Sequence, residues 1–198
     1  RKGCRTGIIT TKGFRDLIEL ARQARASLYD VQVDKPRPII FRRYRKEIDE
    51  RIMFDGSIFK AIDIKEVERV VDELKAEGVE SYAVCLMHAY KNPAHEKIVE
   101  EIIKERHPEA YVSISSDVLP EYREYESMTT TSLNSYIGPI VGKYANLFKK
   151  RVKEMGMSVT PYINQSNGGL MSIETTFGKP IRTALSGPAA GVSGAAYI

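Results

Sequence analysis

The chain has 198 residues and a formal net charge of +4, with 42% hydrophobic and 28% charged residues. This composition is ordinary for a soluble globular protein, and the length allows one large or two small domains with a sizeable core. No apolar stretch approaches the length that spans a bilayer and no signal-peptide pattern is present, so we expect a cytoplasmic protein without membrane contact.

The excess of positive charge lies mainly between residues 37 and 51, where four basic side chains cluster at residues 42–46. Such a run could contact nucleic acid or an anionic substrate, but acidic residues alternate with it. We therefore predict a solvated strand face and no nucleic-acid binding. Cys4 and Cys85 form no Cys-x-x-Cys pair, and the apolar surroundings of Cys85 are typical of a buried thiol.

The first 62 residues predict a strand, a helix, a connector and a hairpin. Residues 6–10 have the apolar character of a buried strand, and apolar side chains recur at helical spacing over residues 14–21. Two prolines and the absence of any period indicate an irregular connector over residues 25–38. Residues 43–52 and 58–62 flank an Asp-Gly turn, which predicts a β-hairpin.

A helix is predicted next. Asp63 and Glu66 fit a capping box, in which an acidic N-cap and a glutamate three positions later satisfy free backbone N–H groups. An apolar stripe begins at Ile64 and continues at helical spacing. Gly78 is expected to end this helix.

A second helix lies between two predicted strands. Residues 81–87 form a continuous apolar run of the buried kind, a helix begins at Asn92-Pro93, and residues 111–115 read as another strand. This alternation of helices and strands predicts an α/β fold with helices packed on a sheet.

Residues 121–155 carry a long helical signal. Gly138-Pro139 interrupts it, which predicts either a kink or two separate helices. An apolar face continues beyond the interruption through Ile140, Tyr144 and Leu147. Gly156 is expected to end the helix.

Residues 160–198 give the strongest indication of a ligand site. A β-type run ends on a glycine corner where the backbone can approach a ligand, and backbone amides together with Asn167 are the expected contacts. A Ser-Gly-Pro turn then opens a helix of small residues, with Ser186 or Gly187 as N-cap. The small face of this helix predicts close packing against another backbone. The predicted ligand-binding residues are Ser166, Asn167, Gly168, Gly169, Ser186 and Gly187.

Ser166 is a weak candidate for a catalytic nucleophile. It lacks the Gly-x-Ser-x-Gly elbow, and no histidine follows it, because His107 is the last in the chain. Ligand contact is the favoured interpretation.

The loop at residues 88–96 is the densest polar group in the first half of the chain. It follows a buried strand, at the end where open α/β sheets usually bind ligands. His88, His95 and Glu96 could ligate a metal, but their spacing is not that of a helical zinc pair. We favour a polar loop whose histidine and asparagine bond to its own backbone and cap the helix at Pro93, and we predict no metal site.

A second polar loop also follows a strand. Glu121, Glu124 and Glu126, with Arg123 among them, could serve acid–base chemistry. Acidic residues are also favoured in the first turn of a helix because of its dipole, and this structural interpretation carries more weight.

Five segments, in this order, resemble the hydantoinase A/5-oxoprolinase family, which also includes β subunits of acetone carboxylase. Together they extend over essentially the whole chain. Any one of them alone would be weak, but five in register make the resemblance specific. The segments are residues 3–16, 88–96 and 119–126, Gln165-Ser166-Asn167-Gly168-Gly169-Leu170-Met171, and Ser186-Gly187-Pro188-Ala189-Ala190-Gly191.

The resemblance implies part of an actin-like or sugar-kinase-type ATPase fold with an inserted α/β region. In that fold two Asp-x-Gly-Gly-Thr-like loops hold ATP between two lobes, and neither loop occurs in these 198 residues. The implied domains are the end of the first lobe with a hairpin (1–62), the inserted region (63–120), and the long helices and connecting segment of the second lobe (121–198). The glycine corner and the small-residue helix would then line the nucleotide cleft.

The resemblance also implies an activity for the intact enzyme: ATP-dependent phosphorylation of a cyclic amide carbonyl, in hydantoin or 5-oxoproline, before ring opening. The alternatives are an ATP-dependent ketone carboxylase β subunit and a subunit-docking module without catalysis. ATP and Mg²⁺ are the implied cofactors, neither expected to bind this chain tightly, and a hydantoinase B-type subunit or domain is the implied partner. Because both phosphate loops are missing, we expect the chain alone to be inactive. Catalytic residues stay unassigned, with His88, Glu121 and Glu124 as candidates for substrate or partner contact.

Overall fold

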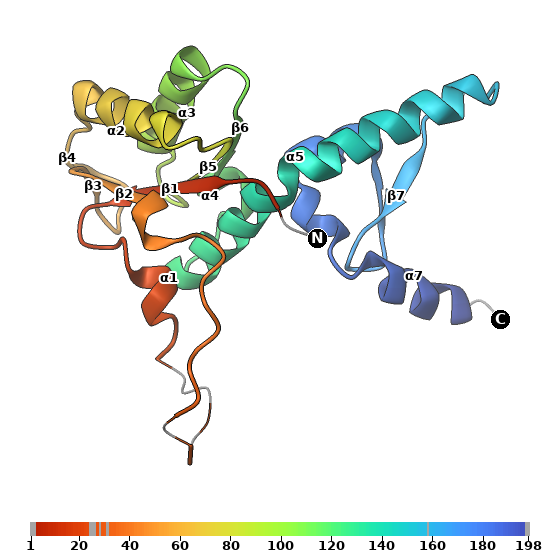
Figure 1. Ribbon diagram of the computed structural model, residues 1–198, viewed down its shortest axis with the longest axis horizontal. Helices are drawn as coiled ribbons and strands as arrows, with labels where there is room; N and C mark the ends of the chain where they lie inside the picture. The colour runs from red at the N-terminus through yellow and green to blue at the C-terminus, as the bar shows by residue number, and fades with distance from the viewer. Residues whose placement is uncertain (1–2, 24–26, 28, 31, 158, 197–198) are drawn as a thin grey trace.

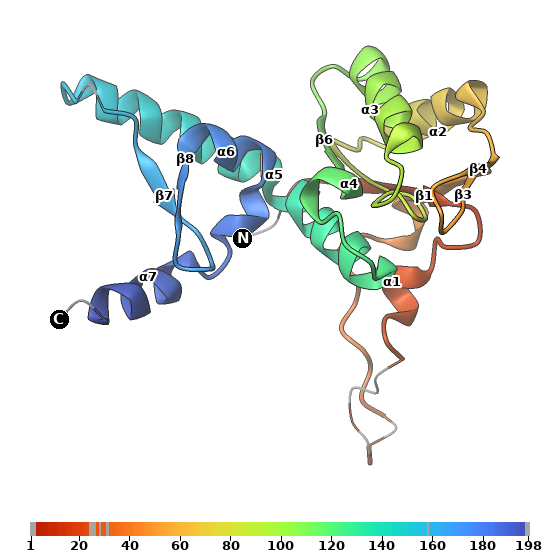
Figure 2. The same ribbon diagram turned by 180° about the vertical axis from the view of Figure 1, so that it is seen from behind.

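The computed structural model describes residues 3–23, 27, 29–30, 32–157 and 159–196. A sheet with its helices lies at one side, and the segments after residue 159 lie at the other, with helix α5 (Glu124–Glu154) running through both (Figures 1 and 2). Among the described residues, none of the helices combines the length and apolar character needed to cross a membrane.

Four parallel strands form the sheet, in the order β2-β1-β5-β6. Helices α2 and α3 pack on one face, and the first half of α5 packs on the other (Figure 1). This three-layer arrangement confirms the α/β prediction. The bounds are β1 Thr6–Thr11, β2 Arg45–Ile48, β5 Ser81–Cys85, β6 Tyr111–Ile114, α2 Ile64–Ala76 and α3 Ala94–Arg106.

The core forms where β1 and β5 meet α2. Four apolar side chains of α2, three or four residues apart, are buried against the sheet, as the helical period predicts. Ile64 is an exception: it was expected in the same stripe, but as the first residue of the helix it is 54% exposed. The buried residues of α2 are Val67, Val70, Val71 and Leu74.

The predicted capping box at the start of α2 is half right. The Asp63 carboxylate accepts a hydrogen bond from the Lys65 N–H, as an N-cap should. The Glu66 carboxylate, however, accepts from the backbone N–H of Asp49 at 2.8 Å instead of reaching back to the cap. Glu66 therefore joins α2 to the end of β2.

The predicted hairpin at residues 43–62 is only partly correct. Residues 45–48 form the edge strand β2, which pairs in parallel with β1, after the short 3-10 helix η1 (Arg42–Tyr44). The antiparallel hairpin is shorter and consists of β3 (Arg51–Ile52) and β4 (Ile58–Lys60). The strand breaks because the chain turns between Ile48 and Arg51 to leave the sheet.

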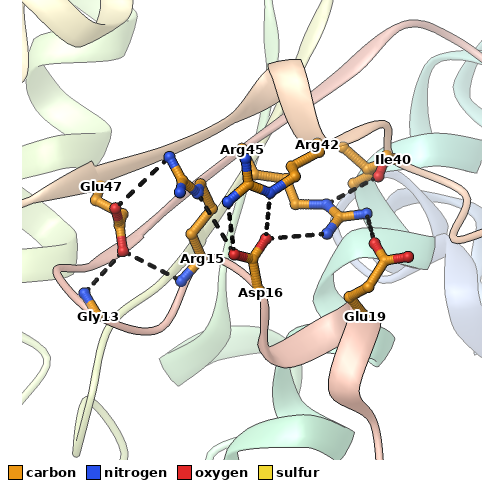
Figure 3. A network of polar contacts seen from close by, with 8 residues as sticks. All are labelled: Gly13, Arg15, Asp16, Glu19, Ile40, Arg42, Arg45 and Glu47. Carbon is orange, nitrogen blue, oxygen red and sulfur yellow. Dashed lines mark hydrogen bonds and ion pairs between the residues drawn. The ribbon is translucent and has the colours of Figure 1, made fainter.

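Arg45 corrects the prediction of a fully solvated basic face, because its side chain is 1% exposed. Its Nε donates to the Ile40 carbonyl at 3.0 Å, and one terminal nitrogen donates to Glu19 at 2.8 Å. Arg42 forms two bonds of 2.9 Å to Asp16, which holds the pKa of that carboxyl below its usual value. Arg15 lies between Asp16 and Glu47 (Figure 3).

Three arginines and three carboxylates therefore balance one another in Figure 3. They hold the β1–α1 loop and the short helix α1 (Leu17–Leu20) against β2. The helix predicted over residues 14–21 is shorter than expected. Of the connector predicted over residues 25–38, residues 25, 26, 28 and 31 lie outside the described part, and the described remainder contains no helix or strand.

Helix α5 continues through Pro139, which excludes the prediction of two helices there. Proline has no N–H, so the Ser135 carbonyl loses its usual partner one turn back. The Ser81 hydroxyl of β5 donates to that carbonyl at 2.8 Å, and the Cys4 thiol lies 3.4 Å from it. The sheet therefore satisfies the carbonyl that proline leaves free.

Of the remaining segments, α6 and η2 pack against α5, and α7 contacts the β7–β8 hairpin. The β7–β8 hairpin leads into α6, the 3-10 helix η2 and α7. Asn134 joins this region to the sheet, because its amide bonds to Ser113 at 3.0 Å and its oxygen accepts from the Ile181 N–H at 3.0 Å. The bounds are β7 Tyr162–Asn164, β8 Leu170–Ser172, α6 Ile173–Gly178, η2 Pro180–Thr183 and α7 Ser186–Ala195.

Candidate functional site

The carboxyl ends of β1 and β5 form the point where the sheet changes direction. From β1 the chain continues to β2 on one side, while β5 lies on the other side of β1. Open α/β sheets bind ligands at such points, because the loops diverge there. A pocket of about 20 Å³ lies at this place, with room for about one water molecule. Its lining includes Thr10, Cys85, His88, Ser115, Glu121 and Glu124.

The structure thus brings His88 together with Glu121 and Glu124, which lie more than thirty residues further along the chain in the second predicted loop. His88 follows β5 in a short turn and adopts a left-handed backbone with φ of 57°. Its Nδ1 atom is buried and has no hydrogen-bond partner among the described residues. A buried polar atom without a partner is uncommon in a folded protein and marks this position for attention.

Glu121 and Glu124 approach the pocket from the start of α5. The helix begins at Glu124, so Glu121 lies in the preceding loop and not in the first turn as predicted. Arg123 between them has φ of 108°, in a region that disfavours side chains. Glu126, the third predicted carboxylate, is bound to Arg22, and this ion pair lowers its pKa. Glu126 is therefore not among the residues that line the pocket.

Glu96 is fully buried beneath the same corner. Its carboxylate accepts from the Leu86 N–H at 3.0 Å, the Ser115 hydroxyl at 2.6 Å and the Ser116 N–H at 2.8 Å. Burial nevertheless raises the pKa of Glu96, and it outweighs the three donors, which act to lower it. Glu96 is thus engaged as a structural acceptor.

His95 and Glu96, two of the three side chains considered as metal ligands, are bonded within the protein. His95 bonds to Glu50 at 2.6 Å, and no three His, Cys, Asp or Glu side chains in the described part of the chain are placed to hold a metal ion. The predicted capping role of the asparagine is confirmed, because Asn92 accepts from the Ala94 N–H at 3.1 Å. Pro93 is the N-cap of α3. A histidine of this loop was also expected to bond to the loop backbone. In the described residues His95 bonds to Glu50 instead, and His88 Nδ1 has no partner.

The second predicted set lies at the β7–β8 turn. The Ser166 N–H donates to the Arg182 carbonyl at 2.8 Å, the Gly168 N–H to Gln165 at 3.1 Å, and the Gly169 N–H to the Asn167 side chain at 3.0 Å. Three of the four backbone N–H groups of residues 166–169 are therefore bonded within the protein. The Ser166 and Asn167 side chains remain exposed at the tip.

The glycine corner lies against α7. An ideal Cβ at Gly168 would stand 2.8 Å from the Ser193 hydroxyl, so the backbone and this helix are in close approach. The two predicted segments are thus neighbours and neither is enclosed in a core, as a shared ligand cleft requires. Their role in binding stays a prediction.

Two details of α7 differ from the sequence prediction. Leu185, with a left-handed φ of 60°, is the N-cap in place of Ser186 or Gly187, and no side chain caps the helix. Close packing was expected on its small face. Within the described residues, ideal Cβ atoms at Gly187, Gly191 and Gly194 would meet nothing within 4 Å, so that face is open.

The two sets of candidate residues lie in different regions. His88 and its neighbours occupy the sheet edge, whereas the glycine corner and α7 lie beyond the second half of α5 (Figures 1 and 2). One compact site therefore does not unite them within the described chain.

Comparison with known proteins agrees with the motif resemblance. Residues 1–107 match the hydantoinase/oxoprolinase N-terminal region, and residues 127–198 match the hydantoinase/oxoprolinase family. An uncharacterized protein of Methanocaldococcus jannaschii is 40% identical over 190 residues, covering 96% of this chain. Caprolactamase subunit alpha of Pseudomonas jessenii is 27% identical over 191 residues, also 96% of the chain. The chain spans only 28% and 27% of the lengths of these two relatives.

Solved structures share the fold. The ATP-dependent caprolactamase from Pseudomonas jessenii matches with a TM-score of 0.80 at 28% identity, over 85% of this chain and 25% of that one. A nucleotide-free acetone carboxylase structure matches with a TM-score of 0.85 at 24% identity, over 98% of this chain and 29% of that one, which shows the fold alone. On the two family matches, the chain belongs to the hydantoinase/oxoprolinase family.

Proposed function

We propose that the chain is part of an ATP-dependent enzyme that opens a cyclic amide. The observation that carries this proposal is the family match over both halves of the chain. It is supported by relatives named 5-oxoprolinase, one of them from Arabidopsis thaliana at 32% identity, and by the structural likeness to an ATP-dependent caprolactamase. In the intact protein, transfer of the terminal phosphoryl group of ATP to the amide oxygen would create a leaving group, so that water can open the ring.

The glycine corner and the first turn of α7 are better suited to contact the outer part of a bound nucleotide than to surround its phosphate groups. Three backbone N–H groups of the glycine corner are already bonded, and the Asn167 side-chain oxygen accepts from one of them, which leaves the Ser166 hydroxyl and the Asn167 side-chain NH2 group to reach a ligand. Ser186 and Gly187 form the first turn of α7, and helix N-termini attract phosphate groups. The proposal places the ligands of Mg²⁺ and the main phosphate contacts outside the described residues.

His88, Glu121 and Glu124 are proposed to contact the substrate or a partner subunit. The free Nδ1 of His88 supports this role, because a buried polar atom gains from a hydrogen-bond partner. The pocket itself holds about one water molecule, so a larger group has to approach from the surface above it.

A ketone carboxylase is the second candidate. Acetophenone carboxylase gamma subunit of Aromatoleum aromaticum is 30% identical over 210 residues. A docking module is the third, because two relatives are named as subunits and Phe54 and Phe59 are 71% and 77% exposed on the β3–β4 hairpin. A hydantoinase B-type subunit is the partner proposed for it.

One assay separates these candidates. ADP formation is measured with Mg²⁺ and ATP for the 198-residue chain and for the longer protein that contains it, with hydantoin, 5-oxoproline or caprolactam, or with a ketone plus bicarbonate. We expect no turnover above buffer for the chain, and turnover that depends on one cyclic amide for the longer protein. Turnover that requires the ketone and bicarbonate, and that no cyclic amide supports, would favour the carboxylase. Turnover by the isolated chain would contradict its expected inactivity.

The docking candidate needs a binding measurement. Titration calorimetry of the chain with ATP, and separately with a hydantoinase B-type subunit, distinguishes a nucleotide contact from a docking surface. Micromolar binding of the subunit, together with a longer protein that hydrolyses no ATP under any condition of the assay, would favour docking over catalysis.

A further inference from the structure

A second buried carboxylate lies close to the His88 corner, and no functional role was predicted for it. Glu50 is 2% exposed, and it lies in the bend between β2 and β3. One oxygen accepts from the Thr11 hydroxyl, and the other lies 2.6 Å from Nδ1 of His95. Thr11 and His95 are themselves 0% and 2% exposed. Three elements of the fold therefore converge on one carboxylate.

The hydrogen bonds of this group form a continuous chain. The Met87 N–H donates to the Thr11 hydroxyl oxygen at 3.0 Å. Thr11 has a single hydroxyl hydrogen, which it donates to one Glu50 oxygen, and the other Glu50 oxygen is bonded to Nδ1 of His95. The chain of bonds thus runs from the backbone of Met87 through Thr11 to Glu50.

Met87 is the residue before His88, whose left-handed backbone is disfavoured for any residue with a side chain. Such a conformation persists only where neighbouring contacts enforce it. Glu96 holds the Leu86 N–H from one side, and Thr11 holds the Met87 N–H from another. Beyond the corner, the Lys91 N–H donates to the His88 carbonyl at 2.9 Å. The backbone of His88 is therefore fixed on both sides.

Glu50 and His88 also line one groove of about 590 Å³, together with Lys12, Arg51 and Phe59. His88 therefore stands between this open groove and the small pocket. His88 lines both spaces, so a ligand in the groove would lie beside this residue.

We propose that Thr11, Glu50 and His95 form a positioning chain that sets the backbone and ring of His88 beside this groove. These residues act through His88 and are not themselves assigned contact with a substrate. The inference rests on the proposed function in one respect, which is that His88 contacts a ligand. Burial of a carboxylate lowers the stability of a core, because the loss of hydration is unfavourable unless the group is fully hydrogen-bonded.

The test uses a matched pair of substitutions at Thr11. Thr11→Val keeps the shape and removes the hydroxyl, whereas Thr11→Ser keeps the hydroxyl. Nuclear magnetic resonance of the chain labelled at histidine gives three sets of ring signals, from His88, His95 and His107, assigned by single His→Gln variants. A second sample labelled with 15N at methionine reports the Met87 amide. We expect Thr11→Val to displace the His88 ring signals and the Met87 amide signal, and Thr11→Ser to leave both near their wild-type positions.

His107 is the internal control, because it ends α3 and bonds to the Tyr82 hydroxyl at 2.9 Å, away from this chain of bonds. General loosening of the fold would move its signals as well. Unmoved His88 signals in Thr11→Val, or equal displacement in Thr11→Ser, would overturn the proposal.

If Thr11→Val does not fold, Glu50→Gln takes its place. Its amide oxygen still accepts from Thr11 but its amide nitrogen faces His95, so a smaller displacement of the His88 signals is expected. No displacement there would equally reject the positioning chain. These measurements need no ligand, so failure of the longer protein to use a cyclic amide would count against the proposed function alone.

Discussion

Gly138 shows how a single residue fixes the contact between α5 and the sheet. An ideal Cβ at this position would overlap the ring of Tyr111, which crosses the helix there. The Tyr111 hydroxyl donates to the Phe177 carbonyl at 2.7 Å, and burial raises its pKa to about 12. The ring cannot move aside without breaking this bond.

Gly138→Ala is therefore expected to lower the free energy of unfolding by about 1–3 kcal/mol, the usual effect of overpacking. Gly142 lies in the same helix, but an ideal Cβ there stands 3.7 Å from Phe177, an ordinary contact. Gly142→Ala should raise stability by about 0.5–1 kcal/mol, because alanine is the better helix former. Urea unfolding of both variants checks the pair, and a change of the same sign in both would contradict it.

At the scale of elements, α5 and β5 are joined by a bond that exists because of proline. Pro139 removes the donor that the Ser135 carbonyl would have within the helix, and the Ser81 hydroxyl replaces it. The Ser135 hydroxyl in turn donates to the Tyr82 carbonyl at 2.8 Å, so helix and strand hold each other twice.

This arrangement predicts coupling between Ser81 and Pro139. Ser81→Ala should lower the free energy of unfolding by about 1–3 kcal/mol, because it leaves a buried carbonyl poorly bonded. In a Pro139→Ala background the new N–H can bond to the Ser135 carbonyl, so the same substitution should matter less. A double-mutant cycle measured by urea unfolding reports the difference, and equal effects in both backgrounds would reject the coupling.

The sequence predicted those elements whose signals are local. The stripe of α2 and the apolar run of β5 follow from spacing alone. Parallel pairing of β2 with β1 does not, because it depends on Asp16 and Glu19 receiving Arg45 in the core. Alternating charges in residues 45–48 read as a solvated strand until those distant partners are known.

The candidate site was predictable in the same partial way. His88 and Glu121 were found because polar loops after strands point to the ligand edge of a sheet. Their meeting in one pocket depends on where α5 crosses the sheet, which no local pattern encodes. Thr11 and Glu50 were missed: a threonine that ends a buried strand is only a weak signal of polar contact, and Glu50 stands among other acidic residues of a predicted strand, so nothing marks it as buried.

At the scale of the whole molecule, the sheet region and the region after residue 159 are connected through α5 and Asn134. The Asn134 side chain is fully buried and bonds to β6 on one side and to residues 178 and 181 on the other. No other fully buried side chain in the described residues was found to bond to both regions.

Asn134→Ala is expected to loosen the second region and leave the sheet intact. Hydrogen exchange should become at least about tenfold faster at the Ile181 amide, since its acceptor is lost and 1.4 kcal/mol corresponds to a factor of ten. Amides of β1 and β5 should be unaffected. Asn146→Ala, at an exposed asparagine of the same helix, is the control, and faster exchange throughout the sheet would contradict the prediction.

Helix α5 has 31 residues and is about 46 Å long, so its two ends are expected to move together as one rigid body. Its far half extends about 22 Å beyond Pro139, so a tilt of about 10° there would carry the tip through about 4 Å. The Ser81–Ser135 hydrogen bond lies close to Pro139 and joins the helix to the first residue of β5, the strand that precedes the His88 corner. A displacement of α6, which packs on α5, is therefore expected to be transmitted to β5.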